Sequence, residues 1–418
     1  MEKLIKRDIF RDLLEHLEKK EISLLVGPRQ VGKTTLMNLL KKRLDESGKR
    51  TLFLSLDFEA DKKYFTSQNE LLAKLKLEFG NDRGYVFIDE IQRKEDAVLF
   101  LKGIYDYELP HKFIVSGSGS LELKEKIHES LAGRKLMFEI WPVSFFEFLN
   151  FKTDYKYEDK LAEYFAVEKD GTSELLEKYL NFGGYPRVIL AETLEEKIRT
   201  IDEIYRSYVE KDISLLLRVE KIDAFNSLVK ILASQIGGML NYSEIANTLG
   251  ISLATVKNYL YYLEKTFVVE LIRPFYKNVR KEITKSPTVY FHDLGLRNYL
   301  LGSFGNLTRP DDLGFLFQNF IFGLLREKVR FTGAKINFWR TKDKAEVDFI
   351  VNQAEGIIPV ETKYKTFAEP SIERSLRGFI EKYRPEKAFV VNKNFSGHFK
   401  LGNTSVELFP YWELLDKI

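Results

Sequence analysis

Apolar residues in residues 1–140 form short continuous runs that are separated by segments of helix length, with glycines near several of the junctions. The runs of strand length are Ile22–Val26, Thr51–Leu56, Tyr85–Ile88, Lys112–Ser116 and Lys135–Ile140. Strands that are apolar at nearly every position are buried on both faces, so the pattern predicts a parallel sheet with helices on each side. Pro142 biases Trp141 away from helix, and we place the first domain at residues 1–146.

The pattern becomes helical between Glu147 and Leu301, which predicts a helical region at residues 147–222 and a second helical unit at residues 223–309. Pro310 opens an α/β domain at residues 310–418. Its expected elements are helix Leu313–Lys328, strands Lys335–Arg340, Ala345–Val351 and Ile357–Lys363, helix Ser371–Tyr383 and strand Lys387–Asn392.

Composition excludes several kinds of protein. With 44% hydrophobic residues the chain is too apolar to be disordered. It has no cysteine, which removes disulfides, thiolate nucleophiles and cysteine metal sites. The net charge is only +3, so a nucleic-acid surface has to be a local patch. The apolar stretches are short and interrupted, and the opening residues do not resemble a signal peptide, so we expect a cytoplasmic protein without membrane segments.

A glycine, four residues and Gly-Lys-Thr follow the first predicted strand and precede a helix at Thr35–Arg43. This is the phosphate-loop pattern, in which backbone N–H groups, the helix N-terminus and a lysine surround a phosphate. The residues expected to bind the nucleotide here are Gly27, Gln30, Val31, Gly32, Lys33, Thr34 and Thr35. Lys33 supplies a full positive charge, and the Thr34 hydroxyl is expected to hold Mg²⁺.

The third predicted strand ends in two acids, Asp89 and Glu90. We expect Asp89 to reach the metal through its water shell and Glu90 to polarise the water that attacks the γ-phosphate. Because a binding module or kinase needs only the first acid, Glu90 distinguishes an ATPase from a switch. Two solvated acids after a strand are the alternative interpretation.

Two further candidates each have an ordinary alternative. Ser116 and Ser118 follow the fourth strand and are candidate γ-phosphate sensors, although a serine-glycine turn has the same sequence. Arg134 precedes the fifth strand and is a candidate arginine finger for a neighbouring subunit, which would require a homo-oligomer. A surface salt bridge is the alternative for Arg134.

Several quoted motifs together resemble a family of archaeal and bacterial AAA-superfamily ATPases that carry a C-terminal domain of unknown function. They are the phosphate loop, Phe87-Ile88-Asp89-Glu90-Ile91-Gln92, Ser116-Gly117-Ser118, Leu131-Ala132-Gly133-Arg134, Trp141-Pro142-Val143-Ser144-Phe145-Phe146-Glu147-Phe148 and Gly183-Gly184-Tyr185-Pro186. The resemblance covers nearly the whole chain and is most specific in its first half. It implies a sheet ordered 5-1-4-3-2 and ATP with Mg²⁺ as ligands.

The segment from Tyr242 to Leu260 has the spacing of a helix-turn-helix, with Ile245, Ala246, Leu249, Ile251, Val256 and Leu260 on its inner face. Its second helix exposes Thr255, Lys257, Asn258 and Tyr261. The following segment contains the basic residues Arg273, Lys277, Arg280, Lys281 and Lys285, which would suit the wing of a winged helix resting on phosphates. A tyrosine-rich second helix is equally typical of a winged helix that binds protein.

The last domain contains a second group of acids. Period-two alternation places Glu346 and Asp348 on one face of a strand, and Glu361 and Lys363 on one face of the next. Asp348, Glu361 and Lys363 can therefore converge, with the two carboxylates as Mg²⁺ ligands and the lysine beside an attacking hydroxide. The arrangement is similar to the restriction-endonuclease-like PD-(D/E)XK superfamily. Gln318 stands where the first helix of such domains often has a metal-binding Glu, and an edge-strand charge pair is the alternative.

These observations predict an Mg²⁺-dependent ATPase whose winged helix and nuclease-like domain engage nucleic acid. The competing hypothesis is an ATP-driven signalling switch whose winged helix and C-terminal domain dock a protein partner.

Overall fold

The computed structural model describes residues 4–118, 131–208, 222–276, 278–307, 310–330 and 332–418. The chain divides into two compact units, and neither is continuous in sequence. Unit 1 contains residues 1–152, 184–220 and 261–268, and unit 2 contains residues 153–183, 221–260 and 269–418. Each unit has its own sheet and core.

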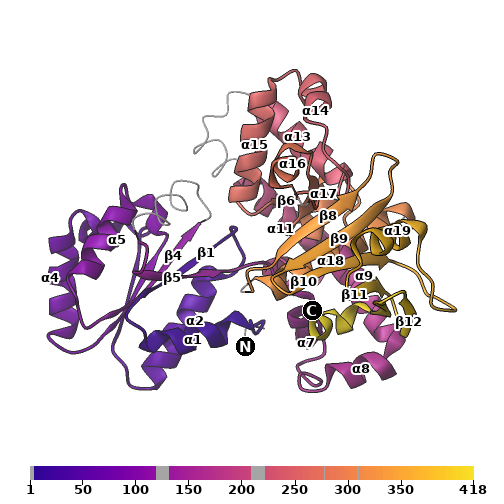
Figure 1. Ribbon diagram of the computed structural model, residues 1–418. Coiled ribbons are helices and arrows are strands. Elements are labelled where there is room, and N and C mark those ends of the chain that lie inside the picture. The colour runs from indigo at the N-terminus through magenta and orange to yellow at the C-terminus, as the bar shows by residue number, and fades with distance from the viewer. Residues whose placement is uncertain (1–3, 119–130, 209–221, 277, 308–309, 331) are drawn as a thin grey trace. The chain divides into compact units, whose positions relative to one another are not determined.

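Unit 1 is built on a five-stranded sheet in which all strands are parallel (Figure 1). The strands are β1 (Ile22–Gly27), β2 (Thr51–Ser55), β3 (Tyr85–Asp89), β4 (Lys112–Ser118) and β5 (Lys135–Glu139). Their order, β2-β3-β4-β1-β5, confirms the predicted parallel sheet and the 5-1-4-3-2 order. The carboxyl ends of β1, β3 and β4 therefore lie side by side, where open α/β sheets bind ligands.

Unit 1 also contains several helices. They are α1 (Ile9–Glu15), η1 (His16–Glu18), α2 (Lys33–Glu46), α3 (Glu59–Lys62), η2 (Lys63–Phe65), α4 (Gln68–Phe79), η3 (Ile91–Arg93), α5 (Ala97–Asp106), α7 (Phe145–Lys152), α10 (Pro186–Leu190) and α11 (Leu194–Ser207). Leu24 and Ile88 belong to one core cluster with Leu75 of α4 and Leu101 of α5. Every residue of β1 and β3 is buried, as continuous apolar runs require.

Unit 2 contains the remaining elements. Its helices are α8 (Leu161–Val167), α9 (Lys169–Phe182), α13 (Ile222–Ser234), α14 (Tyr242–Leu249), α16 (Val279–Thr284), α17 (Leu294–Leu300), α18 (Pro310–Val329), α19 (Arg374–Tyr383), η5 (Tyr411–Glu413) and α20 (Leu414–Lys417). Its strands are β6 (Val269–Ile272), β7 (Thr288–Phe291), β8 (Lys335–Arg340), β9 (Glu346–Gln353), β10 (Gly356–Lys363), β11 (Lys387–Asn392), β12 (Gly397–Leu401) and β13 (Thr404–Pro410). Helix α15 (Leu253–Lys265) begins in unit 2 and ends in unit 1.

The predicted helix-turn-helix is present as α14 and α15. Gly250 takes the left-handed conformation that ends α14, and the Ser252 hydroxyl accepts a hydrogen bond from the Thr255 N–H at the start of α15. Ile245 and Val256 are buried in the expected inner face, while Lys257 and Asn258 are exposed. Strands β6 and β7 follow as an antiparallel pair.

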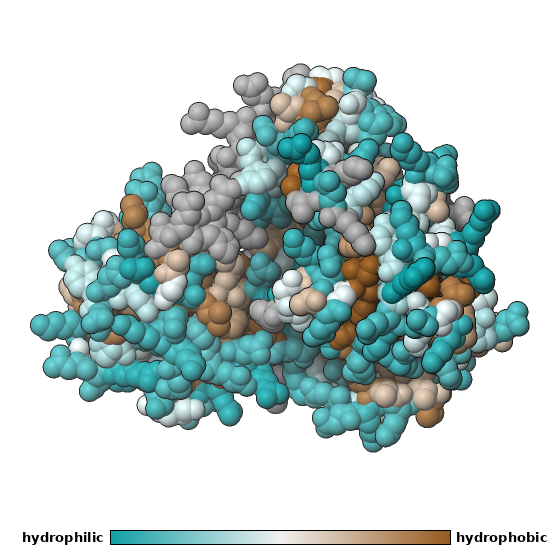
Figure 2. Space-filling model, in the orientation of Figure 1, coloured by the Kyte–Doolittle hydropathy of each residue, from teal (hydrophilic) through white to brown (hydrophobic). Residues whose placement is uncertain are grey.

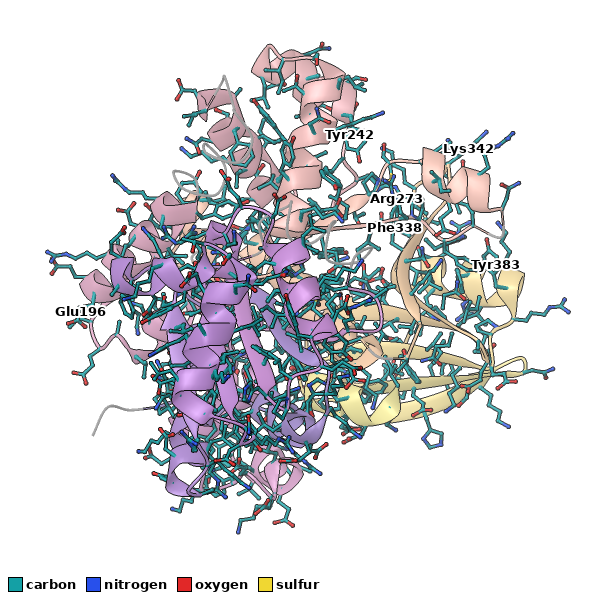
Figure 3. All side chains as sticks on the ribbon, turned by 90° about the vertical axis from the view of Figure 1, so that its left-hand side faces the viewer. Glu196, Tyr242, Arg273, Phe338, Lys342 and Tyr383 are labelled. Atoms are coloured by element: carbon teal, nitrogen blue, oxygen red, sulfur yellow. The ribbon has the colours of Figure 1, made fainter. Side chains whose placement is uncertain are left out.

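The segment between β6 and β7 differs from the free wing that its basic residues suggest. The Arg273 carbonyl accepts a hydrogen bond from the Phe338 N–H at 3.2 Å, and the Phe275 N–H donates to the Phe338 carbonyl at 2.6 Å. Figure 3 shows Arg273 next to Phe338 and near Tyr383, and Phe275 is part of the core under β8 and α19. The start of the segment thus extends the edge of the C-terminal sheet, and α16 follows it. Lys277 and the side chain of Lys281 lie outside the described residues.

The C-terminal sheet is mixed and has the order β12-β13-β11-β10-β9-β8. The expected strands β8 to β11 and helices α18 and α19 are present with small shifts of their ends. Two strands, β12 and β13, were not expected, and the short polar sequence around Gly397 in β12 has the composition of a loop. Pairing with β13 makes β12 an edge strand, where polar side chains are accommodated.

Hydrophilic side chains cover most of the face in Figure 2, and no helix among the described residues has the length and apolarity to cross a membrane.

A buried lysine lies in unit 1 at the first residue of β4. Lys112 is 2% exposed, and its Nζ lies 3.1 Å from His16 Nδ1 and donates to the carbonyl oxygen of Glu21. Burial lowers the pKa of Lys112 to about 7, and burial together with the charge of Lys112 lowers the pKa of His16 to about 4. Folding thus favours the neutral form of both side chains over the charged form.

Stability should therefore rise with pH above neutrality. The unfolded chain binds the Lys112 proton more tightly than the folded chain. The free energy of unfolding therefore increases as the pH rises from the folded pKa of Lys112, about 7, to its unfolded pKa near 10.5. We expect the free energy of unfolding to increase by about 2 kcal/mol from pH 7 to pH 9. Denaturant unfolding of wild type and Lys112→Met at both pH values measures this. Equal pH dependence in the two proteins would contradict it.

Candidate functional site

The phosphate loop joins the end of β1 to the start of α2. Gly32 has φ +96°, a left-handed conformation that glycine adopts without strain, and α2 begins at the next residue. Gly27 makes a close approach to the segment after β5, because a Cβ there would lie 2.0 Å from the Ile140 carbonyl oxygen. These two glycines therefore meet separate requirements of the loop.

The side chain of Lys33 lies inside this loop. The side chain is 6% exposed, and Nζ donates hydrogen bonds to the carbonyl oxygens of Gly27 at 3.0 Å and Pro28 at 2.6 Å. Val31 is buried, and Thr34 and Thr35 are exposed in the first turn of α2. The predicted loop residues are thus assembled around the N-terminus of one helix, where backbone N–H groups and the helix dipole favour an anion.

The acids at the end of β3 lie next to the loop. Thr34 Oγ1 donates to Asp89 Oδ2 at 2.9 Å, although 55 residues separate them. The buried Ser116 hydroxyl donates to Asp89 Oδ1 and accepts a hydrogen bond from the Glu90 N–H at 3.2 Å. The structure therefore brings together Thr34, Asp89, Glu90 and Ser116, with Ser116 engaged in holding the two acids. The side chain of Ser118 lies outside the described residues.

Glu90 has an unusual backbone and a side-chain partner. Its φ of +58° is left-handed, which is uncommon for a residue other than glycine and occurs often at functional sites. Gln92 Nε2 donates to Glu90 Oε2. The sequence motif contains Gln92 but does not predict this contact, for which the spacing of two residues from Glu90 is the only local signal.

A second unpredicted contact involves the Gly183-Gly184-Tyr185-Pro186 motif. Arg187, which follows it, donates from Nη1 to Gln30 Oε1 at 2.8 Å and to Glu203 Oε1 at 2.9 Å. Gln30 belongs to the phosphate loop and has φ +60°. A cation therefore contacts a loop side chain from 157 residues away, and local spacing contains no signal for that pairing.

Arg134 pairs with an acid of its own domain. Its Nε lies 2.7 Å from Asp106 Oδ1, and both side chains are partly exposed. The ion pair raises the pKa of Arg134 and lowers that of Asp106. This is the geometry of the salt-bridge alternative, so a role in a neighbouring subunit would require Arg134 to leave Asp106.

The acids of the C-terminal domain converge around Asp348. Gln318 Nε2 of α18 donates to Asp348 Oδ1 at 3.1 Å, and the Thr362 N–H and hydroxyl of β10 both donate to Asp348 Oδ2 at 2.7 Å. Gln318 Nε2 also donates to the buried Tyr290 hydroxyl at 3.0 Å. Burial raises the pKa of Asp348 against the opposing effect of the Thr362 hydrogen bonds. Gln318 thus contacts Asp348 from α18, where restriction-endonuclease-like domains often have a metal-binding Glu.

Lys363 forms ion pairs with two glutamates of the C-terminal domain. Its Nζ lies 3.0 Å from Glu361 Oε1 and 2.7 Å from Glu373 Oε1. Although burial alone would lower the pKa of Lys363, the charge of Glu361 raises it. Burial and the neighbouring Asp348 raise the pKa of Glu361 to about 8. Glu361 Oε2 is buried and has no hydrogen-bond partner among the described residues.

Within the described ranges, no group of three or more His, Cys, Asp and Glu side chains is arranged to hold a metal ion. The α18 side chain that contacts Asp348 is the neutral amide of Gln318.

Comparison with known proteins divides the chain in three. Residues 19–149 match a family described as an AAA domain, and residues 173–306 and 313–413 match two domains of unknown function, DUF8612 and DUF4143. An uncharacterized protein of Mycobacterium tuberculosis is 27% identical over 378 residues, which cover 90% of this chain and 77% of the relative. An uncharacterized protein of Methanocaldococcus jannaschii is 26% identical over 429 residues, which cover 98% and 91%.

Solved structures with some similarity include RuvB of Thermotoga maritima, with 18% identity, a TM-score of 0.31, and coverage of 65% of this chain and 89% of that one. AMPPCP-bound DnaA from Aquifex aeolicus has 17% identity, a TM-score of 0.29, and coverage of 63% and 90%. The AAA match agrees with the strand order and the phosphate loop of unit 1. The AAA-domain match, the strand order and the phosphate loop support an AAA-type P-loop ATPase fold for residues 19–149.

Proposed function

We propose that this chain hydrolyses ATP with Mg²⁺ at the phosphate loop of unit 1 and couples hydrolysis to binding of nucleic acid. The observation that carries the ATPase assignment is the 2.9 Å hydrogen bond between Thr34 Oγ1 and Asp89 Oδ2, with Glu90 directly after it. It joins the two ends of the predicted site, which are far apart in sequence.

The residues at this point suit Mg²⁺. A hydroxyl and a carboxylate are hard oxygen donors, and Asp89 is 5% exposed in a polar setting. Thr34 and Asp89 would hold the ion, directly and through water. Bound Mg²⁺ would neutralise part of the charge on the phosphates.

The protein's own groups account for the rest of the chemistry. Lys33 and the N–H groups at the start of α2 would bind the β- and γ-phosphates. Glu90, oriented by Gln92, would accept a proton from the water whose oxygen attacks the γ-phosphorus. The bond from that phosphorus to the β–γ bridging oxygen breaks, and ADP leaves with the bonding electrons while phosphate takes the water oxygen.

The nucleic-acid part of the proposal rests on the exposed second helix of the helix-turn-helix. Lys257 and Asn258 are exposed on α15 and chemically suited to phosphate and base contacts. The basic segment from Arg273 supports nucleic-acid binding less than its composition suggests, because its first residues are hydrogen-bonded to β8. The alternative from another class remains a signalling switch whose winged helix and C-terminal domain bind a protein.

ATP turnover with and without nucleic acid tests this proposal. We expect Mg²⁺-dependent hydrolysis that single- or double-stranded DNA or RNA stimulates, and binding that weakens steeply as salt rises. Lys257→Glu should reduce stimulation without changing basal turnover, and Glu264→Gln, farther along the same helix, is the control. Turnover that responds to no nucleic acid would favour the switch.

A mixing experiment tests Arg134. If Arg134 acts in a neighbouring subunit, Arg134→Ala mixed with Lys33→Ala should recover part of the ATPase activity, because one complete site forms from two defective subunits. Turnover is measured at concentrations where the protein assembles. No recovery would leave Arg134 as the partner of Asp106.

A second candidate function is a divalent-cation-dependent nuclease in the C-terminal domain. The specific observation in its favour is the buried Glu361 Oε2, for which the described part of the chain provides no hydrogen-bond partner, while Lys363 pairs with the other oxygen, Oε1. An unsatisfied carboxylate oxygen fits a cation site, but Gln318 donates into Asp348 where an acid would add charge. The residues that would hold the ion are Asp348 and Glu361, and the proposal predicts weak cation affinity.

Cleavage assays with Mn²⁺ test this candidate. We expect Mn²⁺ to support more activity than Mg²⁺, since it tolerates a weaker ligand set, and Asp348→Asn to reduce cleavage at least about 100-fold with unchanged ATPase activity. Gln318→Glu should raise Mn²⁺ affinity, and Glu355→Gln on an exposed turn is the control. If neither wild type nor Gln318→Glu cuts single-stranded, double-stranded or branched DNA or RNA, the domain is a binding module.

A further inference from the structure

A buried ion pair lies directly beside the phosphate loop. Arg7 Nε donates to Glu147 Oε2 at 2.9 Å, and the side chains of Arg7 and Glu147 are 9% and 6% exposed. The two residues are 140 apart in sequence, and Glu147 belongs to the Trp-Pro-Val-Ser-Phe-Phe-Glu-Phe motif, for which the ATPase chemistry has no role. A buried pair is costly to desolvate unless its remaining hydrogen bonds are made.

The remaining nitrogens of Arg7 bind carbonyl oxygens on two segments. Nη1 donates to the Val31 carbonyl at 3.1 Å, and Nη2 donates to the Trp141 carbonyl at 2.7 Å. Val31 is in the phosphate loop, one residue before Gly32. The planar guanidinium therefore connects the loop to the chain that follows β5, which a lysine with a single nitrogen cannot do.

Glu147 is fixed from its other side. Its Oε1 accepts a hydrogen bond from the Asp8 N–H at 2.8 Å, and its Oε2 accepts one from the Ser144 N–H at 2.9 Å. Both carboxylate oxygens are thus bonded to backbone. Glu147 can therefore hold the guanidinium of Arg7 in one orientation.

The same segment supports the start of the loop. The Ile140 N–H donates to the Val26 carbonyl at 2.7 Å, and Gly27 packs against the Ile140 carbonyl so closely that no side chain fits. Residues on both sides of the loop's bend are therefore anchored to the chain between Ile140 and Glu147.

The Val31 contact determines the direction of one N–H group. A trans peptide unit is planar, with its C=O and N–H pointing in opposite directions. When Arg7 holds the Val31 carbonyl, the N–H of Gly32 in the same peptide unit has to point away from Arg7. Because Gly32 lacks a Cβ and has φ +96°, this peptide unit would otherwise rotate at low cost.

We propose that Arg7 and Glu147 are positioning residues of the nucleotide site, which aim the Gly32 N–H at the β-phosphate by holding the Val31 carbonyl. The inference rests on the proposed ATP site and adds a specific role for the N-terminal segment and the Trp141 to Phe148 motif. It concerns the phosphate contacts alone, so its effect depends on the number of phosphates.

Nucleotide affinity measured as a function of phosphate number tests the inference. Displacement of a fluorescent ATP analogue gives Kd for ATP, ADP and AMP with wild type, Arg7→Gln and Glu147→Gln. We expect Kd for ATP and ADP to rise at least about tenfold in both variants, the effect of losing one hydrogen bond to a charged group. Kd for AMP, which has no β-phosphate, should stay within about twofold.

Control variants separate positioning from stability. Arg11→Gln removes the exposed Arg11–Glu15 pair in α1 and should leave every Kd unchanged. Arg7→Lys keeps the positive charge, but its single nitrogen cannot contact both the Val31 carbonyl and the Glu147 carboxylate. Its Kd for ADP should therefore be higher than that of wild type, as in Arg7→Gln. If Arg7→Gln does not fold, Arg7→Lys replaces it as the test variant. Unfolding curves identify the temperature at which each variant is fully folded, and affinities are compared there.

Two results would overturn the inference. Folded Arg7→Gln or Arg7→Lys that binds ADP as tightly as wild type removes the positioning role, and equal losses for AMP and ADP make the pair purely structural. In both cases wild type still binds ATP and Lys33→Ala does not, so the proposed function survives. Wild type that binds no nucleotide would end both proposals.

Discussion

Lys33→Ala should abolish detectable ATP binding. The Lys33 ammonium lies inside the loop, held by the Gly27 and Pro28 carbonyl oxygens, and it is 6% exposed. Phosphate oxygens would replace these neutral acceptors with charged ones, and charge-assisted hydrogen bonds are about twice as strong. Alanine removes that interaction and leaves the two carbonyl oxygens without this donor beside the triphosphate.

Calorimetric titration with ATP and Mg²⁺ measures the effect. Lys42→Ala is the matched control, because Lys42 lies on the same helix, is 74% exposed and pairs with Glu46 at a distance of 3.9 Å. We expect Lys42→Ala to bind as wild type does. Equal affinity in wild type and Lys33→Ala would mean that the loop is not the ATP site.

Glu90→Gln should keep ATP binding and reduce turnover at least about 100-fold. Glutamine has nearly the same shape, so the backbone hydrogen bond from the Glu90 N–H to Ser116 can remain. It cannot accept a proton from the attacking water, and Gln92 would then face an amide in place of a carboxylate. Binding and hydrolysis should therefore separate in this variant, whereas both are lost in Lys33→Ala.

Single-turnover hydrolysis and ATP titration on the same preparation measure the two quantities. Glu95→Gln, which changes an exposed acid five residues later, should have wild-type turnover. Gln92→Ala should lower the rate less than Glu90→Gln does, because it frees the carboxylate without removing it. Normal turnover in Glu90→Gln would contradict the assignment of Glu90 and point to a binding switch.

In the C-terminal domain, alternation along the strands predicts which side chains share a face but not which partners they contact. Alternation along two strands predicts that Asp348 and Glu361 share a face, and in the structure these acids follow one another on paired strands, since Phe349 of β9 lies opposite Val360 of β10. It did not reveal that Gln318 and Thr362 donate to Asp348 or that Lys363 pairs with Glu373. Those partners come from a helix, from a neighbouring backbone and from beyond the strand, and alternation within a strand contains no information about them.

The sequence by itself determined the parallel sheet, the phosphate loop, the acids after β3 and the helix-turn-helix, because each depends on residues that are neighbours in one or two elements. Only the tertiary structure showed that Arg273 extends the edge at β8, that Arg187 contacts Gln30, and that Arg7, which is paired with Glu147, donates directly to the Val31 carbonyl. Such contacts join residues far apart in the chain, and their hydrogen bonds depend on how whole elements pack. Local patterns of polarity specify which face of an element is buried, whereas packing specifies which polar group meets which.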